Sequence, residues 1–301
     1  MSGVNGMKIS VYTFLFLTLF AGSPALAQVD LSGEWSPNRA HEDQTPRPNV
    51  LPGDYAGMPI NDNARARADA WTATRWTLPE WQCRPHPLGY LERGPSELKI
   101  WQEIDPVSRE AVAIHTEWLR SVDYPIYMDG RPHPSENAPH SWGGFSTGEW
   151  IGDVLKVSTT HLKEGYMRRS GVFRSDRSEI TQFLTRRGNV LTYTSIIHDP
   201  AYLEEPLIRS REYLLDLHQR LPPYPCTVVT EVDMDPGVVP HYLPGTNPTL
   251  GAFASYYDIP IEASRGGAET MYPEYRKKLK EMTDRPFPRP LRAIACEGLV
   301  C

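Results

Sequence analysis

Positively charged residues are not in excess in this sequence: 31 lysines and arginines face 37 aspartates and glutamates, which gives a net charge of −6. This balance argues against a nucleic-acid-binding protein, because such proteins need clustered positive charge. Beyond residue 27 the sequence contains no apolar run of about 18 residues, the length that a transmembrane helix requires. The remaining composition is ordinary for a globular protein and excludes a coiled coil, a collagen-like rod or a disordered tail.

Strong catalytic and cofactor-binding motifs are also missing. The sequence contains no Gly-x-Ser-x-Gly, no His-Glu-x-x-His, no phosphate-binding loop and no dinucleotide fingerprint. We therefore expect no cofactor and assign no metal site, although the nine histidines would permit a metal site assembled by the fold. Any chemistry has to come from residues that different strands bring together.

Proline, in contrast, is abundant: 29 of 301 residues, against a usual share of about 5%. This predicts many turns and extended loops, chiefly towards the two ends of the chain. We divide the sequence into a leader (1–27), a proline-rich N-terminal segment with a first strand and one helix (28–95), a β-barrel core (96–216) and a C-terminal extension of loops and a helix that packs on the barrel (217–301).

The leader has the pattern of a secretory signal peptide. Lys8 precedes an apolar run over 11–21, and residues 24–27 (Pro-Ala-Leu-Ala) contain an Ala-x-Ala cleavage pattern. A membrane anchor is the alternative, but the run is too short to span about 30 Å of hydrocarbon comfortably. We expect cleavage after Ala27 and export to the periplasm or beyond, with no stable membrane anchor.

Four cysteines follow the leader: Cys83, Cys226, Cys296 and Cys301. In an oxidising compartment an even number of cysteines favours disulfides. We prefer the pairing Cys83–Cys226 with Cys296–Cys301, although chain order leaves the two other pairings open. A four-cysteine zinc site is the alternative, but no Cys-x2-Cys spacing supports it.

Two helices are expected outside the β core. Residues 61–76 carry apolar side chains at helical spacing, and Asp62 or Asn63 can cap the start. Residues 273–282 are highly charged, and Pro273 suits the first turn of a helix there.

The β core contains short segments in which inward and outward side chains alternate. These segments cover 97–104, 111–119, 126–128, 178–186, 190–199 and 207–216, and residues 150–155 are typical of a hairpin. Turn residues separate them, among them Asp129-Gly130, which is typical of a hairpin. A meander of this length commonly closes into an antiparallel up-and-down barrel, because closure removes exposed edges. We therefore predict a mainly β fold, with a barrel whose interior can hold a ligand.

Residues 31–35 (Leu-Ser-Gly-Glu-Trp) resemble the Gly-x-Trp opening of lipocalin-like barrels. In those barrels the tryptophan closes one end, and an arginine from a late strand packs over it. The resemblance implies a lipocalin-like barrel in which Trp35 has this place, with Arg209 or Arg211 stacked on its ring.

Three further stretches, 127–134, 146–155 and 198–200, are similar to a largely uncharacterised family of secreted bacterial β-rich proteins. They carry its Asp-Gly-Arg-Pro-His-Pro and Gly-x-Trp-x-Gly-Asp-x-Leu patterns. This resemblance spans roughly residues 80–216 and implies the fold and export, but no activity. The family pattern has histidine where this chain has Phe145, which weakens a catalytic role for that position.

The densest group of chemically active side chains lies within fourteen residues: Tyr127, Asp129, Arg131, His133 and His140. Imidazole transfers protons near neutral pH, and guanidinium holds a carboxylate or a developing oxyanion. This combination predicts a catalytic site, with His133 as acid or base, Arg131 holding an oxygen, and Tyr127 or Asp129 assisting. The alternative is a rigid turn in which Arg131 pairs with a nearby acid.

Two residue pairs are candidates for ligand binding. His115 and Glu117 share one face of their strand and would form an acid–base pair if they faced the interior. The bulkier residues Val112, Ile114 and Trp118 lie on the opposite face, which favours the outer face for His115 and Glu117. His198 and Asp199 end a strand at the predicted mouth of the barrel. A turn in which Asp199 accepts backbone hydrogen bonds is the alternative there.

Two further groups complete the candidate ligand-binding residues. Arg168 and Arg169, with His161 and Lys163, form a basic patch that fits an anionic ligand group, unless it is simply solvated charge. Tyr256 belongs to an aromatic run in the C-terminal loops that can close over a cavity.

These patterns predict an exported, cofactor-independent enzyme that applies acid–base chemistry of lyase, isomerase or hydrolase type to a hydrophobic small molecule inside the barrel. The alternative is a periplasmic carrier or sensor that binds such a molecule without changing it, and the lack of a catalytic motif favours this alternative. A purely structural envelope protein is a third interpretation. We expect no nucleic-acid partner, and the sequence predicts no oligomeric state.

Overall fold

The computed structural model describes residues 29–38, 51–90, 97–119, 121–218, 220–222, 225–232, 234–235 and 237–282. The chain divides between Asp30 and Leu31 into two compact units, and the architecture below belongs to the second. The predicted leader and the predicted Cys296–Cys301 pair lie outside the described residues. Within the described ranges, no helix is long and apolar enough to cross a membrane.

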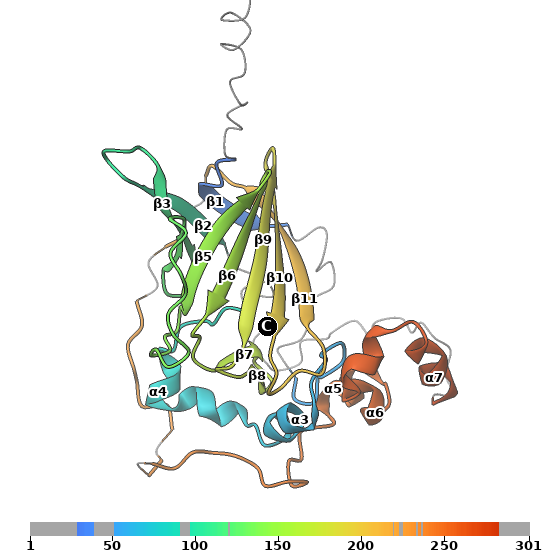
Figure 1. Cartoon of the computed structure of the whole chain (residues 1–301). Helices are drawn as coiled ribbons and strands as arrows, with labels where there is room; N and C mark the ends of the chain where they lie inside the picture. Colours follow the sequence, from blue (N-terminus) through green and yellow to red (C-terminus); the bar gives the residue numbers. More distant parts are fainter. Residues whose placement is uncertain are drawn as a thin grey trace, which may run out of the picture. The chain divides into compact units, whose positions relative to one another are not determined.

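The core of the fold is a closed barrel to which the described residues contribute nine strands (Figure 1). They are β1 (Gly33–Pro37), β2 (Leu98–Ile104), β3 (Ala111–Trp118), β4 (Tyr124–Tyr127), β5 (Phe145–Ile151), β6 (Val154–Thr160), β9 (Glu179–Arg187), β10 (Val190–His198) and β11 (Leu207–Leu215). β1 closes the barrel because it pairs with β2 on one side and with β11 on the other. The predicted mainly β, lipocalin-like barrel is thus confirmed, and short helices lie before and after it in the chain.

The pair β4–β5 departs from the predicted up-and-down order. These strands are parallel, with Ile126 opposite Ser146, whereas the other neighbours in the described barrel are antiparallel. A parallel pair requires the chain to return along the barrel before β5 begins, and residues 128–144 make this return. The predicted hairpin at Asp129-Gly130 is therefore wrong, although Gly130 does turn the chain with a φ of +72°.

The other local predictions in the β core agree with the structure. The expected strands match β2, β3, β9, β10 and β11 within one residue at each end. Tight hairpins join β5 to β6 through Gly152 and β9 to β10 through Gly188, and both glycines have positive φ values, of +64° and +60°. Such values suit the turns that match the twist of two antiparallel strands.

Side chains point alternately inward and outward along each strand, and the inward ones fill the interior of the barrel. Leu155, Leu184 and Leu191 point inward and are 0% exposed. Some polar groups inside the barrel pair with one another, as the hydroxyls of Ser146 and Thr159 do at 2.8 Å. The inward side chains leave little exposed surface along the described strands, so a ligand site fits better at an end of the barrel.

Trp35 has the buried position that the lipocalin-like resemblance implies, but a different arginine accompanies it. Trp35 is 0% exposed, and the Cζ atom of Arg186 lies 5.3 Å from its ring centroid. Arg209 and Arg211 do not take this place, so that prediction is wrong. Trp35 pairs with Leu215, which puts Arg211 four residues away along β11, about 13 Å at the usual rise per residue.

One end of the barrel is covered by short helices and a separate hairpin (Figure 1). The hairpin consists of β7 (Gly165–Arg168) and β8 (Val172–Arg174) and lies between β6 and β9 in the chain. The helices are α3 (Asp62–Asp69), the 3-10 helix η1 (Ala73–Thr77) and α4 (Pro79–Gln82), and α3 contacts β8. We call this region the barrel end.

The helix predicted over 61–76 is in fact broken into α3 and η1. Asn61 caps α3, because its side chain accepts a hydrogen bond from Ala64 N at 3.1 Å, so the predicted caps Asp62 and Asn63 are wrong. α3 ends at Asp69, and Trp71 follows with only 4% of its surface exposed. Burial of this large ring under β7 and β8 takes precedence over the continued helical pattern.

The described part of the C-terminal extension, up to residue 282, carries four short helical segments. They are α5 (Ala252–Tyr257), α6 (Ile261–Ser264), the 3-10 helix η3 (Gly267–Met271) and α7 (Tyr275–Glu281), of which α7 confirms the charged helix predicted over 273–282.

The predicted disulfide Cys83–Cys226 is present and joins the end of α4 to the C-terminal extension across 143 residues of sequence. Gln82 strengthens the same junction, because its side-chain amide donates to Val229 O at 2.7 Å and accepts from Val229 N at 2.8 Å. The covalent link therefore fixes α4 at the barrel end.

Candidate functional site

The structure places the predicted catalytic group on the outer surface of the barrel. Asp129 and Arg131 are exposed and form an ion pair, with Arg131 Nε 2.8 Å from Asp129 Oδ1. This guanidinium lowers the pKa of Asp129 to about 2. The Cζ atom of Arg131 also lies 3.9 Å from the ring centroid of Tyr127. These three residues are brought together, but as a surface turn.

The two histidines of that group hold the returning segment 128–144 against β5 and β6. His133 hydrogen-bonds through its two ring nitrogens with the hydroxyls of Thr160 at 2.7 Å and Thr147 at 2.9 Å. Burial lowers the pKa of His133, and the nearby His161 lowers it further. His140 hydrogen-bonds through Nδ1 to the backbone carbonyl of Leu162 at 3.1 Å, and its ring packs on that of His161 with centroids 5.5 Å apart.

His115 and Glu117 lie on the outer face of β3, the face that the sequence favours, while the residues between and beside them point inward. His115 Nδ1 is 2.9 Å from Asp123 Oδ1, and its Nε2 is 3.2 Å from Glu103 Oε2. Burial lowers the pKa of His115, but the two carboxylates outweigh burial and leave it above the ordinary value. Glu117 belongs to a different place, a surface pocket that is described below.

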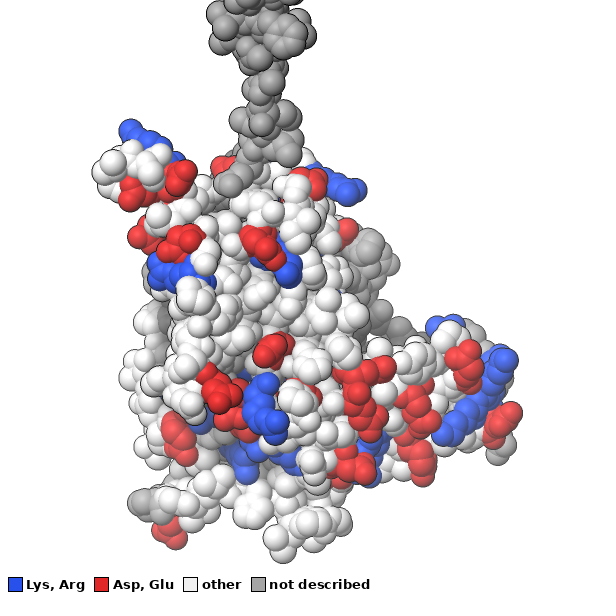
Figure 2. Space-filling view, viewed as in Figure 1, with Lys and Arg blue, Asp and Glu red and all other residues white. Residues whose placement is uncertain are grey.

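The two arginines of the predicted basic patch, Arg168 and Arg169, make separate contacts. Arg168 donates to Asp54 Oδ1 at 2.6 Å and to the carbonyl of Ala56 at 2.9 Å, so it ties β7 to the N-terminal segment. The Cζ atom of Arg169 lies 4.5 Å from the ring centroid of Trp76. Figure 2 shows charges of both signs interspersed on the face it presents, without a continuous basic surface.

The remaining predicted residues make local contacts. Asp199 is 2% exposed and accepts from the backbone N–H of Ser175 at 2.6 Å and of Ala201 at 2.9 Å, as in the turn weighed as the alternative for this residue. His198 is exposed at the end of β10. Tyr256 packs on Tyr257 in α5, with ring centroids 4.9 Å apart.

A cluster that the sequence prediction missed lies at the barrel end. Its aromatic residues come from η1, α4, β7, β8 and the turn before η1: Trp71, Trp76, Trp81, Tyr166 and Phe173. Their rings meet mostly edge to face, with centroids between 5.1 and 6.4 Å apart. Trp76 stays partly exposed, as does the neighbouring Tyr90. The barrel-end cluster thus presents aromatic surface that a ligand can cover.

Four arginines lie over the rings of the barrel-end cluster. Arg84 is closest, with its Cζ atom 3.5 Å from the centroid of Trp81. Arg67 lies over Phe173 at 4.8 Å, and Arg75 and Arg169 lie over two of the other tryptophans. Such cation–π contacts hold the guanidinium groups against a largely apolar wall.

Glu164 is the acidic residue among these cations. It precedes β7, is about one-third exposed, and forms an ion pair with Arg67. Burial raises the pKa of Glu164 above the ordinary glutamate value, although Arg67 and Arg84 act in the opposite direction. A carboxyl group with a raised pKa keeps its proton closer to neutral pH and is therefore suited to proton transfer.

His86 and Tyr166 form a second polar pair beside the aromatic rings. The Nδ1 atom of His86 and the hydroxyl of Tyr166 are hydrogen-bonded, and the carbonyl of His86 accepts from the Tyr124 hydroxyl at 2.8 Å. Arg84 lies within electrostatic range of both Tyr166 and Glu164. The site therefore joins a carboxyl, a phenol, an imidazole and a guanidinium.

A buried arginine fixes the backbone next to Glu164. Arg174, in β8, is 0% exposed and donates to the carbonyls of Leu88 and Lys163, both at 2.9 Å. Lys163 directly precedes Glu164, so this hydrogen bond fixes the backbone that presents the glutamate. Arg174 is thus a positioning residue for the barrel-end cluster.

The described residues contain no group of three or more histidine, cysteine, aspartate or glutamate side chains that could hold a metal ion. Comparison with protein families, with curated proteins and with solved structures found no match for this chain. The candidate site therefore rests on its own geometry: a carboxyl with a raised pKa among arginines and partly exposed aromatic rings at the barrel end.

The sequence carries one signal that points to this site. Trp71, Trp76 and Trp81 recur at intervals of five residues within the proline-rich N-terminal segment. This spacing fits neither a strand nor a single helix, so it indicates tryptophans that are grouped by tertiary structure. Nothing local marks Glu164, because its partner Arg67 is 97 residues away in the chain.

Proposed function

We propose that this protein is a cofactor-independent enzyme that binds a hydrophobic, ring-containing small molecule at the barrel end and carries out acid–base chemistry on it, of lyase, isomerase or hydrolase type. The site lies at the end of the barrel rather than along its axis, because the inward side chains of the strands are buried.

The observation that carries this proposal is the placement of Glu164. The Glu164 side chain is partly buried and forms an ion pair with Arg67. Its pKa is raised, and Arg84 lies nearby. A purely structural ion pair on the surface lowers the pKa of its carboxyl, as Arg131 does for Asp129. Titratable groups whose pKa moves towards neutrality cluster at functional sites.

The geometry suggests a division of roles. The partly exposed face of Trp76 would stack on the ring of the substrate. Glu164 would give a proton to the substrate or remove one from it. Arg84 would stabilise negative charge that develops on a substrate oxygen, and the hydrogen-bonded pair Tyr166–His86 would pass a proton to or from the same oxygen.

We also propose that the protein is exported to the periplasm or beyond as a member of the secreted bacterial β-rich family it resembles. The leader pattern over 1–27 supports this, and so does the disulfide Cys83–Cys226, since structural disulfides persist in oxidising compartments.

A carrier that binds the same molecule without changing it is the second candidate. The observation that favours it is the extent of mutual packing: the basic and aromatic groups of the barrel-end cluster already stack on one another, which suits recognition of a planar ligand without any reaction.

The test begins with the small molecules that co-purify with the full-length protein isolated from the periplasm of its expression host, identified by mass spectrometry. The compound found is then incubated with the wild type and with Glu164→Gln, Arg84→Ala, Arg131→Ala and His133→Ala variants. We expect turnover by the wild type, a loss of at least about 100-fold in kcat for Glu164→Gln, and less than about twofold change for the two loop variants.

Each result assigns the function differently. Binding without turnover by the wild type would make the protein a carrier. Turnover that is lost in His133→Ala or Arg131→Ala but kept in Glu164→Gln would move the active site to the outer loop and contradict the proposal. Circular dichroism spectra that match the wild type establish that each variant is folded.

A further inference from the structure

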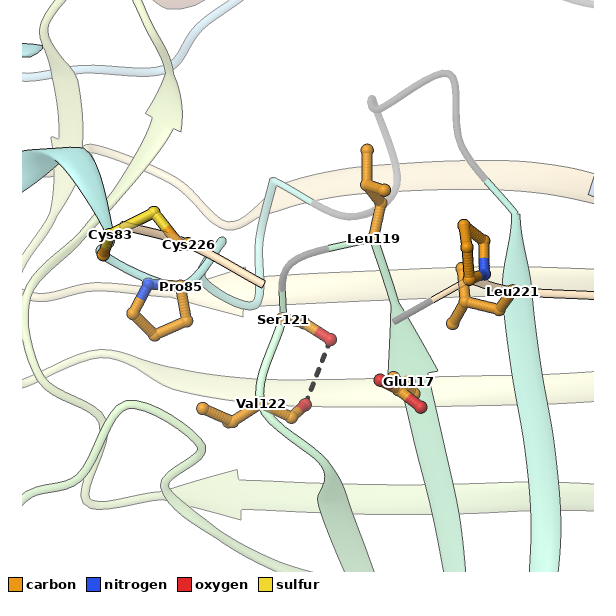
Figure 3. Close-up of a pocket in the computed structure, with 9 residues that line it drawn as sticks. Cys83, Pro85, Glu117, Leu119, Ser121, Val122, Leu221 and Cys226 are labelled. Atoms are coloured by element: carbon orange, nitrogen blue, oxygen red, sulfur yellow. Dashed lines mark hydrogen bonds between the residues drawn. A yellow bond between two sulfur atoms is a disulfide. The ribbon is translucent and has the colours of Figure 1, made fainter. Parts of the chain in front are cut away.

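A cavity lies on the outside of the barrel, beside the end of α4. It has a volume of about 270 Å³ and lies between the end of β3, the segment that follows it and the C-terminal extension (Figure 3). Its wall is mixed in polarity: Leu119, Val122 and Leu221 supply apolar surface, and the disulfide Cys83–Cys226 lies on one side. This volume is close to the lower end of about 300–1,000 Å³ for small-molecule sites.

Among the described residues that line the cavity, the charged side chain is that of Glu117. The alternation of β3 sends this side chain outward, because its neighbours Thr116 and Trp118 are buried inside. Within the described residues, the Glu117 carboxylate has no hydrogen bond or ion pair. Lys99 lies opposite it in β2, but its Nζ atom is directed to Trp101 and lies 5.1 Å from that ring centroid.

The other polar groups of the wall are already occupied. Ser121 Oγ accepts from Trp118 N at 2.9 Å and donates to Val122 O at 3.0 Å, the bond drawn in Figure 3. Glu34, next to the cavity, accepts from the backbone N–H of Leu221 at 3.0 Å and so holds that part of the wall. Among the described lining residues there is no cation, so the negative charge of Glu117 favours a cationic ligand group.

We propose that this cavity binds a small organic ammonium ion that carries an apolar substituent, with the Glu117 carboxylate as its counter-ion. The ammonium group supplies the hydrogen-bond donors that Glu117 lacks, and the apolar substituent covers Leu119, Val122 and Leu221. None of its lining residues belongs to the barrel-end cluster, although Cys83 and Pro85 flank Arg84 in the chain.

The disulfide contributes one wall of the cavity. It links Cys226 covalently to Cys83 at the end of α4, while Glu34 holds Leu221 by a hydrogen bond. We therefore expect reduction of the disulfide to loosen this wall and to weaken the proposed site.

Titration of the full-length protein with benzylamine, benzyl alcohol and benzoate at neutral pH, followed by calorimetry and by NMR, tests the proposal. These probes share a ring and differ in charge. We expect benzylamine to bind, benzyl alcohol to bind about tenfold more weakly or worse, and benzoate not to bind. The amide resonances of Leu119 and Val122 are expected to shift, and those of Trp76 are not.

The variant Glu117→Gln keeps the shape of the cavity and removes its charge, while Glu110→Gln removes an exposed charge from the turn before β3. We expect Glu117→Gln to weaken benzylamine binding at least about tenfold, and Glu110→Gln and Glu164→Gln to leave it unchanged. Removal of the disulfide in the Cys83→Ala/Cys226→Ala variant is expected to weaken it as well. Equal binding of benzylamine and benzyl alcohol, or unchanged binding by Glu117→Gln, would overturn the proposal.

Discussion

The loop of residues 128–144 and the barrel end both bring arginine, histidine and acidic side chains together, but they do so in different surroundings. In the loop, Asp129 and Arg131 pair in water, and the pKa of Asp129 falls to about 2. At the barrel end, Glu164 also pairs with an arginine, yet its pKa is raised because partial burial outweighs the effect of the arginines.

This difference shows that solvent exposure, rather than the identity of the partners, decides what an ion pair can do. An exposed pair keeps both groups charged and contributes little to stability. Partial burial weakens the preference for the charged carboxyl and raises its pKa. The barrel end therefore has the properties of a reactive site, and the loop has those of a charged surface turn.

The largest loss of stability is expected when the disulfide Cys83–Cys226 is removed. The Cys83→Ala/Cys226→Ala variant loses a link that spans 143 residues, and we expect the free energy of unfolding to fall by about 4 kcal/mol. Urea denaturation of this variant and of the wild type measures the difference. A fall below about 1 kcal/mol would mean that the extension does not hold α4 in place.

A somewhat smaller loss is expected for Arg174→Met. This variant leaves the carbonyls of Leu88 and Lys163 buried without their donor, at a cost of about 3 kcal/mol. The matched control is Arg177→Met, which removes an exposed arginine three residues later and should change stability by less than about 0.5 kcal/mol. Similar losses in the two variants, again measured in urea, would contradict the positioning role of Arg174.

His133 and His115, which lie outside the barrel end, should contribute to the pH dependence of stability with opposite signs. Because the pKa of His133 is lowered on folding, the unfolded chain binds protons more readily, and stability falls as the pH drops below about 6.5. Because the pKa of His115 is raised by Asp123 and Glu103, its contribution is full at low pH and is lost as the pH rises through the raised pKa.

Urea denaturation across about pH 5 to 8 measures both contributions. We expect His133→Asn to remove part of the loss on the acid side and His115→Asn to remove part of the loss on the alkaline side. The variant His198→Asn, which changes an exposed histidine at the end of β10, serves as the control. Identical profiles for all three variants would argue against these assignments.

The smallest effect is expected for Asp129→Asn. The exposed ion pair with Arg131 is screened by water, so the free energy of unfolding and the turnover of any substrate should stay the same within error. Denaturation and activity measured side by side check this. A clear loss of turnover would restore the loop as the catalytic site.

The barrel was predictable because its signals are local. In β9 and β10 apolar and polar side chains alternate, and Gly188 marks the turn between them. The parallel pairing of β4 and β5 was not predictable, because it depends on the path of the returning segment rather than on the strands themselves. The same reasoning explains why Arg186, and not Arg209 or Arg211, lies over Trp35: the register between strands decides it.

The candidate site was harder to predict for a similar reason. Proximity in sequence favoured Tyr127, Asp129 and Arg131, which do meet, but on an exposed turn. Glu164 and Arg67 come from segments far apart in the chain, and only the packing of α3 against β8 brings them together. Long-range assembly of this kind leaves no motif in a single sequence.

The proton affinity of Glu164 is the property on which the account depends, and NMR titration of its side-chain carboxyl carbon measures it directly. We predict a midpoint above the ordinary glutamate value in the wild type, with the Asp129 carboxyl in the same sample titrating near 2. A Glu164 midpoint at or below the ordinary value would show that the barrel end holds a permanently charged ion pair, and would contradict its assignment as the acid–base site.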